Sequence, residues 1–244
     1  MDLNEYNRFK ENQEQITVFL TFTHQNLLRL SKIESLDEAQ LRKVSGFFNF
    51  HTFQCMYIVC IELCKLYHDS NNQKWNYLKL FRRFKNERHG RDFMEIIEAN
   101  GQGRDEGTIG YDNTIGSIQE LSDEVDVYED RITGYADLIR DIKELRDTIY
   151  AHSDGNYNLT ASLSVNDLTP LVTLSSEIYN QIHGKIERAE TNFSGAFVAD
   201  INEVIDIGIE RMKYVDLQYD LYTLLDDNNV DIAKIKERIN QGIQ

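Results

Sequence analysis

The sequence predicts an all-α protein, and two observations support this fold class. Pro170 is the only proline in 244 residues, so little in the chain interrupts a helix. Long stretches also carry apolar residues at intervals of three and four, which is the spacing of one buried face of a helix. A chain of this length buries a substantial core. We therefore expect an antiparallel helical bundle with additional C-terminal helices.

The first hundred residues predict four helices. The first is expected over residues 3 to 31, and the second begins at the capping-box pattern Ser35-Leu36-Asp37-Glu38 and runs to about Tyr67. The polar run at 69 to 72 and the glycine at 90 then separate two shorter helices. We expect these near residues 73 to 86 and 91 to 99.

Four glycines between 101 and 110 mark a loop, and a long continuous helix is expected after it, from about 114 to 152. Its apolar residues form one stripe: Ile115, Ile118, Leu121, Val125, Tyr128, Ile132, Tyr135, Leu138, Ile139, Ile142, Leu145 and Ile149. Further helices are expected near 167 to 190, 198 to 225 and 230 to 240. Residues 1 to 190 should form the bundle, and residues 191 to 244 a C-terminal helical extension packed on it.

Arg146 and His152 lie at the end of this long helix, on the margins of its apolar stripe. Six positions along a helix correspond to a rise of about 9 Å and a separation of about 120°, so we do not expect the two side chains to touch within one chain. A guanidinium and an imidazole beside a packing seam need a partner or a use. One interpretation is structural, with Arg146 paired to a carboxylate and His152 hydrogen-bonded at the helix end. The other is a catalytic site.

The local sequence LRDTIYAHSD, residues 145 to 154, resembles the signature of the HEPN superfamily in its abortive-infection branch. These all-helical domains include prokaryotic ribonuclease toxins. The segments at 63 to 69 and 75 to 80 also resemble that branch, so the resemblance covers residues 37 to 190. Asp147 stands where the family frequently has asparagine.

The resemblance implies a HEPN-type bundle and a metal-independent endoribonuclease, active in phage defence or as the toxin of a toxin–antitoxin pair. It implies a composite site across a homodimer, with Arg146 and His152 as catalytic residues and Asp147 and Asp154 supporting them. It implies no cofactor and no metal, and RNA as the substrate, with an antitoxin or a regulatory protein as a further partner. The alternative is a non-catalytic HEPN-like interaction module that binds a protein or RNA partner.

The net charge of −15 argues against nucleic-acid binding, but the charge is unevenly distributed. Cationic residues outnumber acidic ones in residues 1 to 91, whereas residues 92 to 244 are strongly acidic. The RNA-binding candidates are Arg82, Arg83, Lys85 and Arg88, interleaved with Trp75, Tyr77, Phe81 and Phe84. One interpretation is phosphate binding by the cations and base stacking on an exposed aromatic side chain. The other is a core of aromatic side chains with a solvated cationic face, or a docking surface for the acidic half of a partner subunit.

Other patterns predict structural roles. Cys55, Cys60 and Cys64 lie in one apolar segment without metal-ligand spacing, so we expect reduced core cysteines. The acidic residues between 120 and 130 lie mostly opposite the apolar stripe, which favours a solvated face over a metal site. No apolar run approaches the length of a membrane span, and the N-terminus does not resemble a signal peptide. We therefore expect a cytoplasmic protein without membrane contact.

Overall fold

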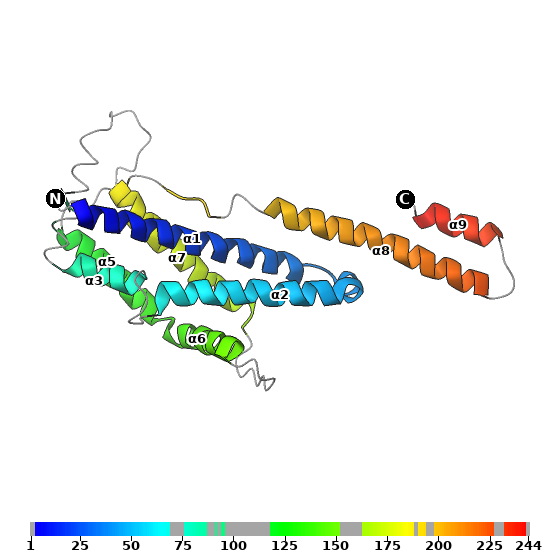
Figure 1. The fold of residues 1–244 in the computed structure, drawn as a ribbon, viewed down its shortest axis with the longest axis horizontal. Coiled ribbons are helices and arrows are strands. Elements are labelled where there is room, and N and C mark those ends of the chain that lie inside the picture. The colour runs from blue at the N-terminus through cyan, green and yellow to red at the C-terminus, as the bar shows by residue number, and fades with distance from the viewer. Residues whose placement is uncertain are drawn as a thin grey trace, which may run out of the picture.

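The structure, a computed structural model, describes residues 3–68, 76–86, 91, 94–95, 118–151, 163–187, 190–193, 198–226 and 232–242. Within these ranges every longer regular element is an α-helix, so the predicted all-α class is confirmed for them. The helices are α1 (Leu3–Glu34), α2 (Glu38–Tyr67), α3 (Tyr77–Lys85), α5 (Ile118–Thr133), α6 (Ala136–Ala151), α7 (Val165–Glu187), α8 (Val198–Asp226) and α9 (Ile232–Gly242) (Figure 1).

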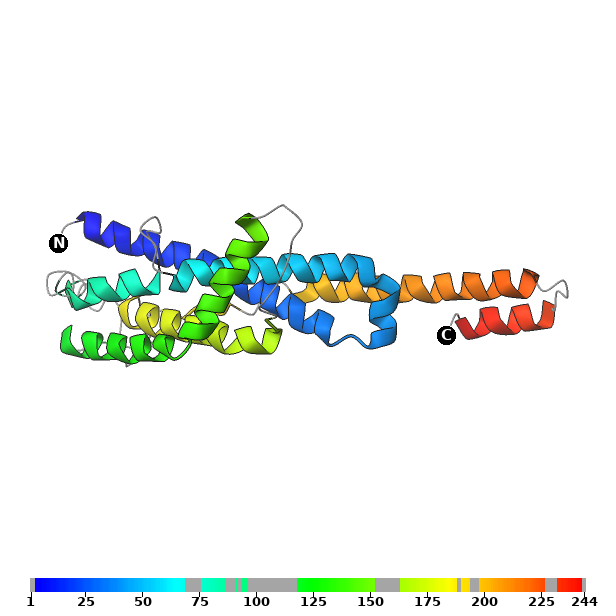
Figure 2. The ribbon, with the colours of Figure 1, turned by 90° about the horizontal axis from the view of Figure 1, so that it is seen from below.

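An antiparallel hairpin of α1 and α2 forms the centre of the bundle. α7 packs along α1, α6 crosses α2, and α3 lies beside α5, as Figures 1 and 2 show from two sides. The shared core follows the predicted spacing of three and four, and includes Ile16, Leu20, Val59, Leu63, Leu168, Leu171 and Ile178, each at most 1% exposed. Burying an aliphatic side chain of this size contributes roughly 2 kcal/mol. This core holds the helices of the bundle together.

Ser175 on α7 links three helices through a buried polar cluster. The Tyr77 hydroxyl donates to the Ser175 carbonyl at 2.6 Å, and the Tyr67 hydroxyl hydrogen-bonds with Ser175 Oγ at 2.7 Å. Burial raises the pKa of both tyrosines, so both stay protonated and able to donate. The Tyr179 hydroxyl, one turn further along α7, hydrogen-bonds with that of Thr17 on α1 at 2.7 Å. These bonds fix the position of α7 along α1, α2 and α3.

Asn76 begins α3 and also joins it to the end of α2. Its side-chain oxygen accepts from the backbone N–H of Lys79 at 2.7 Å, which satisfies one of the free donors of the first helical turn. Its side-chain nitrogen donates to the carbonyl of His68 at 3.1 Å. Because the Asn76 side chain is fully buried, its amide must find these partners within the protein.

The expectation of one continuous helix from 114 to 152 is wrong. α5 ends at Thr133 and α6 begins at Ala136, with a turn at Gly134 and Tyr135 between them. Glycine has a low helix propensity, and the Tyr135 N–H bonds to the carbonyl of Ile132, three residues back, instead of continuing the helical pattern. The turn lets α5 pack on α3 while α6 crosses α2. Residues 114–117 and 152 lie outside the described ranges, as does most of the helix expected at 91 to 99.

The C-terminal helices extend away from the bundle. α8 contacts α1 and α2, and both views show most of α8, with α9 folded back beside it, beyond the end of the α1–α2 hairpin (Figures 1 and 2). None of the α8 side chains that the structure describes is buried. That residues 191 to 244 form a unit distinct from residues 1 to 190 stays a prediction.

Two further expectations concern the cysteines and the membrane. Cys55, Cys60 and Cys64 are buried and free, which confirms the expected reduced core cysteines. In the described part of the chain, none of the helices combines the length and the apolar character that a bilayer crossing requires.

We predict that Asn76→Ala destabilises the fold by about 2 kcal/mol, because it removes the α3 cap and the side-chain bond to the His68 carbonyl. Asn76→Ser should retain part of the cap and lose less. Urea unfolding followed by circular dichroism measures both changes. Ser35→Ala is the control, because the Ser35 hydroxyl donates to the Lys32 carbonyl at the exposed end of α1 and does not cap α2. Equal stability of the wild type and Asn76→Ala would contradict this role.

Candidate functional site

Arg146 lies on α6, beside the face of that helix that packs on α2. Ile142 is 1% exposed and Leu145 7%, so these two residues bind α6 to the bundle. Arg146 follows Leu145 directly, which places it at the edge of the packed surface, with 28% of its side chain exposed. The expected position on the margin of the apolar face is therefore observed for Arg146.

Asp147 holds the guanidinium of Arg146. Its Oδ1 accepts from Arg146 Nε at 2.8 Å and from Nη2 at 2.6 Å, and its Oδ2 accepts from Lys143 Nζ at 2.7 Å. Both hydrogen bonds of Arg146 use one edge of the guanidinium. Among the described residues, Nη1 has no hydrogen-bond partner. The three side chains together carry one net positive charge, so the cluster suits an anionic ligand.

The electrostatics of this cluster keep Asp147 ionised. Partial burial alone would raise the pKa of Asp147, but the hydrogen bonds and charges of Lys143 and Arg146 hold it below its ordinary value. Cys64 on α2 lies within the field of the same three side chains. Burial raises the pKa of its thiol to about 11, opposed by the positive charge of Arg146, so Cys64 stays a protonated core residue.

The other residues of the predicted catalytic set, His152 and Asp154, lie outside the described residues. The structure therefore brings Arg146 together with Asp147, and the relation of Arg146 to His152 stays a prediction. The same holds for Arg88 among the RNA-binding candidates.

The aromatic residues of the predicted RNA-binding segment belong to the core. Tyr77, Phe81 and Phe84 on α3 are at most 1% exposed, so a base cannot stack on them in this fold. This is the second of the two interpretations, in which the aromatic side chains are core. Trp75 lies outside the described residues.

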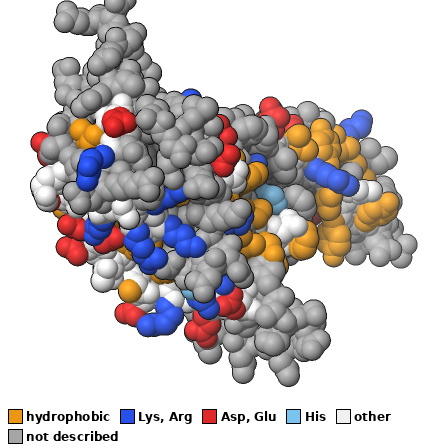
Figure 3. All heavy atoms as spheres, turned by 60° about the vertical axis from the view of Figure 1, so that its left-hand side comes forward, with side chains coloured by type: hydrophobic (Ala, Val, Ile, Leu, Met, Phe, Trp, Pro, Cys, Tyr) orange, Lys and Arg blue, Asp and Glu red, His pale blue; other side chains and the backbone are white. Residues whose placement is uncertain are grey.

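The cations of the same helix lie at the surface. Arg82 is exposed and Arg83 half-buried, while Lys85 forms ion pairs with Asp126 and Glu129 of α5. On the end of the molecule that carries α3 and α5, lysine and arginine side chains lie beside aspartate and glutamate (Figure 3). Lys85 therefore ties α3 to α5. RNA binding by Arg82 and Arg83 stays a prediction.

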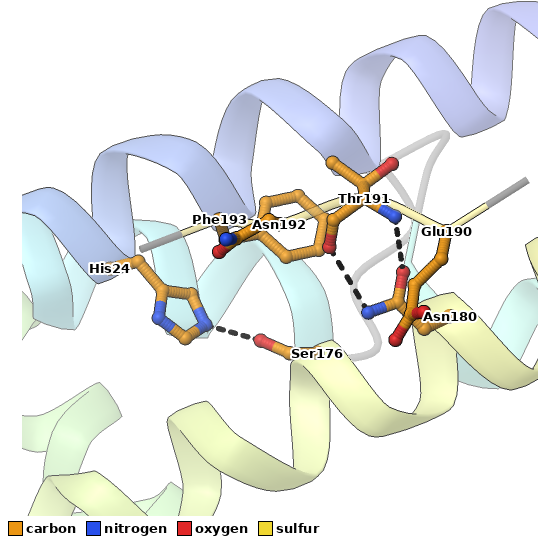
Figure 4. Close-up of a pocket in the computed structure, with 7 residues that line it drawn as sticks. All are labelled: His24, Ser176, Asn180, Glu190, Thr191, Asn192 and Phe193. Atoms are coloured by element: carbon orange, nitrogen blue, oxygen red, sulfur yellow. Dashed lines mark hydrogen bonds between the residues drawn. The ribbon is translucent and has the colours of Figure 1, made fainter. Parts of the chain in front are cut away.

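A pocket of about 440 Å³ lies between α1, α7 and the segment 190–193, and the sequence did not predict it. Figure 4 shows the residues that line it: His24, Ser176, Asn180, Glu190, Thr191, Asn192 and Phe193. Asn180 holds the segment in place, because its amide both donates to the Thr191 carbonyl at 3.1 Å and accepts from the Thr191 N–H at 3.0 Å. The lining comes from three separate stretches of chain, so no local motif signals the pocket.

Two histidines belong to this part of the bundle. His24 stacks on Phe193 with ring centroids 5.6 Å apart, and its Nε2 hydrogen-bonds with Ser176 Oγ. His183 stacks on Tyr179 at 4.8 Å, and its buried Nδ1 has no hydrogen-bond partner among the described residues. Burial lowers the pKa of both imidazoles. Both rings are therefore neutral near pH 7 and act mainly as packing groups.

None of the residues that the structure describes forms a cluster of three or more metal-ligating side chains. Comparison of the chain with family models, with curated proteins and with solved structures finds no match. The functional argument therefore rests on the residues themselves.

The half-buried histidines His24 and His183 make a testable contribution to the pH dependence of stability. Their folded-state pKa lies below that of the unfolded chain, so the unfolded chain binds protons first as the pH falls. The free energy of unfolding should be highest above a pH of about 6.5 and decrease as the pH falls through that value. Urea unfolding between about pH 7.5 and 5.5 should show a smaller decrease for His24→Gln and for His183→Gln. A decrease identical to that of the wild type in both variants would contradict this assignment.

Proposed function

We propose that the chain is a metal-independent endoribonuclease of the HEPN type, acting as a homodimer in phage defence or as the toxin of a toxin–antitoxin pair. The observation that carries the proposal is the arrangement of Arg146 and Asp147, in which the carboxylate binds one edge of a partly exposed guanidinium. A guanidinium oriented in this way can present its remaining N–H groups to a phosphate. His152 follows six positions later, in the sequence pattern that resembles the HEPN signature.

The proposed reaction needs one base and one cation. Neutral His152 accepts the proton of a ribose 2′-hydroxyl, and the resulting oxygen attacks the adjacent phosphorus. The bond from phosphorus to the 5′-oxygen breaks, which leaves a cyclic phosphate on one fragment and a 5′-hydroxyl on the other. Arg146 stabilises the charge that develops on the phosphoryl oxygens. Asp147 acts as a positioning residue, because it touches the guanidinium and not the reacting atoms.

The alternative function is a non-catalytic HEPN-like module that binds a protein or RNA partner. The ion pairs of Lys85 favour it, because they engage one of the predicted RNA-binding cations within the chain. The Arg146–Asp147 pair does not decide between the two functions. An intrachain ion pair favours the binding module, whereas the partial exposure of the pair favours the nuclease. Loss of activity on substitution of Arg146 is therefore the decisive readout.

We predict that Arg146→Ala and His152→Ala each lower the rate of RNA cleavage by at least about a hundredfold in excess EDTA, because each removes a group that acts on the transition state. Arg146→Lys should lose most of the activity too, since an ammonium cannot form the two bonds to Asp147 Oδ1 in the same geometry. Cleavage of labelled RNA by purified protein measures these rates.

Arg140→Ala is the matched control. Arg140 lies on the same helix, is 67% exposed and pairs with Asp137, so its loss removes an arginine of α6 without touching the proposed site. It should cleave at the wild-type rate, and circular dichroism should show that all variants stay folded. Cleavage by folded His152→Ala at the wild-type rate would overturn the catalytic assignment.

A further inference from the structure

The sequence of α8 carries a heptad pattern of apolar residues. Residues at alternating intervals of four and three are apolar or glycine: Ile201, Ile205, Gly208, Met212, Val215, Tyr219 and Tyr222. This spacing is typical of the a and d positions of a left-handed coiled coil. We refer to these seven positions as the α8 seam.

The described side chains of the α8 seam are exposed. Val215 is 56% exposed, Tyr219 73% and Tyr222 64%, which is unusual for three large apolar residues along one line of a helix. α9 packs on another side of α8, where Arg238 donates two bonds to Asp220 Oδ2, at 2.9 and 2.7 Å. Three exposed apolar side chains along one line of a helix indicate an interaction surface.

Gly208 supports close approach of a second helix at the seam. A glycine inside a helix costs about 1 kcal/mol relative to alanine. A Cβ at position 208 would meet no atom of the described residues within 4 Å, so none of these residues requires a glycine there. A second helix packed against the seam would supply a reason, because a missing side chain lets two backbones approach closely.

Charges beside the seam indicate which partner it fits. In the heptad defined by the seam, Arg211 occupies a g position and Asp216 the following e position, and both side chains are exposed. In a parallel pair of identical helices, a g residue of one helix lies beside the next e residue of the other. Arg211 of each copy then faces Asp216 of the other copy, which gives two symmetric pairs of opposite charge.

We infer that α8 forms a parallel two-stranded coiled coil with α8 of a second copy of this chain. The twofold axis runs along the seam, and α9 of each copy lies on the outside. Because α8 contacts α1 and α2 of its own bundle, a parallel pairing places both bundles at the same end of the coiled coil. The inference does not depend on ribonuclease activity, since it uses only the surface of α8.

Sedimentation equilibrium of the full chain tests the inference first. The wild type should have twice the 28.5 kDa mass of the monomer. Tyr219→Glu, which places a charge in the seam, should raise the dissociation constant at least about tenfold. Tyr214→Glu is the matched control, because Tyr214 lies on the same helix, is 63% exposed and is outside the seam. Its dissociation constant should stay within about twofold of the wild type.

Cysteine substitution tests the orientation. Val215→Cys and Tyr222→Cys should each form a covalent dimer on oxidation, because equivalent d positions face each other in a parallel pair. An antiparallel pair can bring together at most one of these positions with its own copy. The three native cysteines are buried, and the wild type is the control for their reactivity. A monomeric wild type, equal weakening by Tyr219→Glu and Tyr214→Glu, or cross-linking at only one position would each overturn the inference.

Discussion

The buried hydrogen bonds around Ser175 are the constraint on which the rest of the bundle depends. A polar group in the core must find a partner, and the hydroxyls of Tyr67 on α2 and Tyr77 on α3 both find one at Ser175 on α7. With α3 fixed in this way, Lys85 meets the acidic face of α5. The turn after α5 then sends α6 across α2, and this crossing places Arg146 at the edge of the packed surface. The position of the candidate site therefore depends on how α5 is held against α3 and α6 against α2.

Periodicity predicted most of the helices, because helical faces in a compact bundle are selected by burial. The break at Gly134 was not predicted, since the apolar spacing passes through Tyr135 into α6 without interruption. Pairing of Arg146 with a carboxylate was one of the two interpretations of the sequence, but the helical spacing did not indicate that Asp147 is the partner. Adjacent residues on a helix do not normally face each other, and the long arginine side chain must turn back to reach Asp147. The pocket beside His24 combines residues from three stretches of chain, so its existence depends on tertiary structure that no local pattern encodes.

Several of the charged side chains form ion pairs that join different helices. Much of the acidity lies on exposed helical surfaces, and some of it is neutralised locally, by Lys85 on α5 and by Arg131 at Glu177, where two bonds of 2.5 and 2.7 Å join α5 to α7. The Arg146 cluster differs in retaining a net positive charge at a partly exposed position. A coiled coil along α8 would bring two such clusters to the same end of a dimer.

The measurement that tests the central claim most directly is the chemistry of the RNA ends that the purified protein produces in excess EDTA. The account predicts fragments that end in a 2′,3′-cyclic phosphate and begin with a 5′-hydroxyl, because the attacking group is the neighbouring ribose hydroxyl and no metal takes part. Cleavage that EDTA abolishes and that leaves 5′-phosphate ends would contradict it, because a metal-activated water would then be the nucleophile. So would intact RNA after prolonged incubation with the folded dimer.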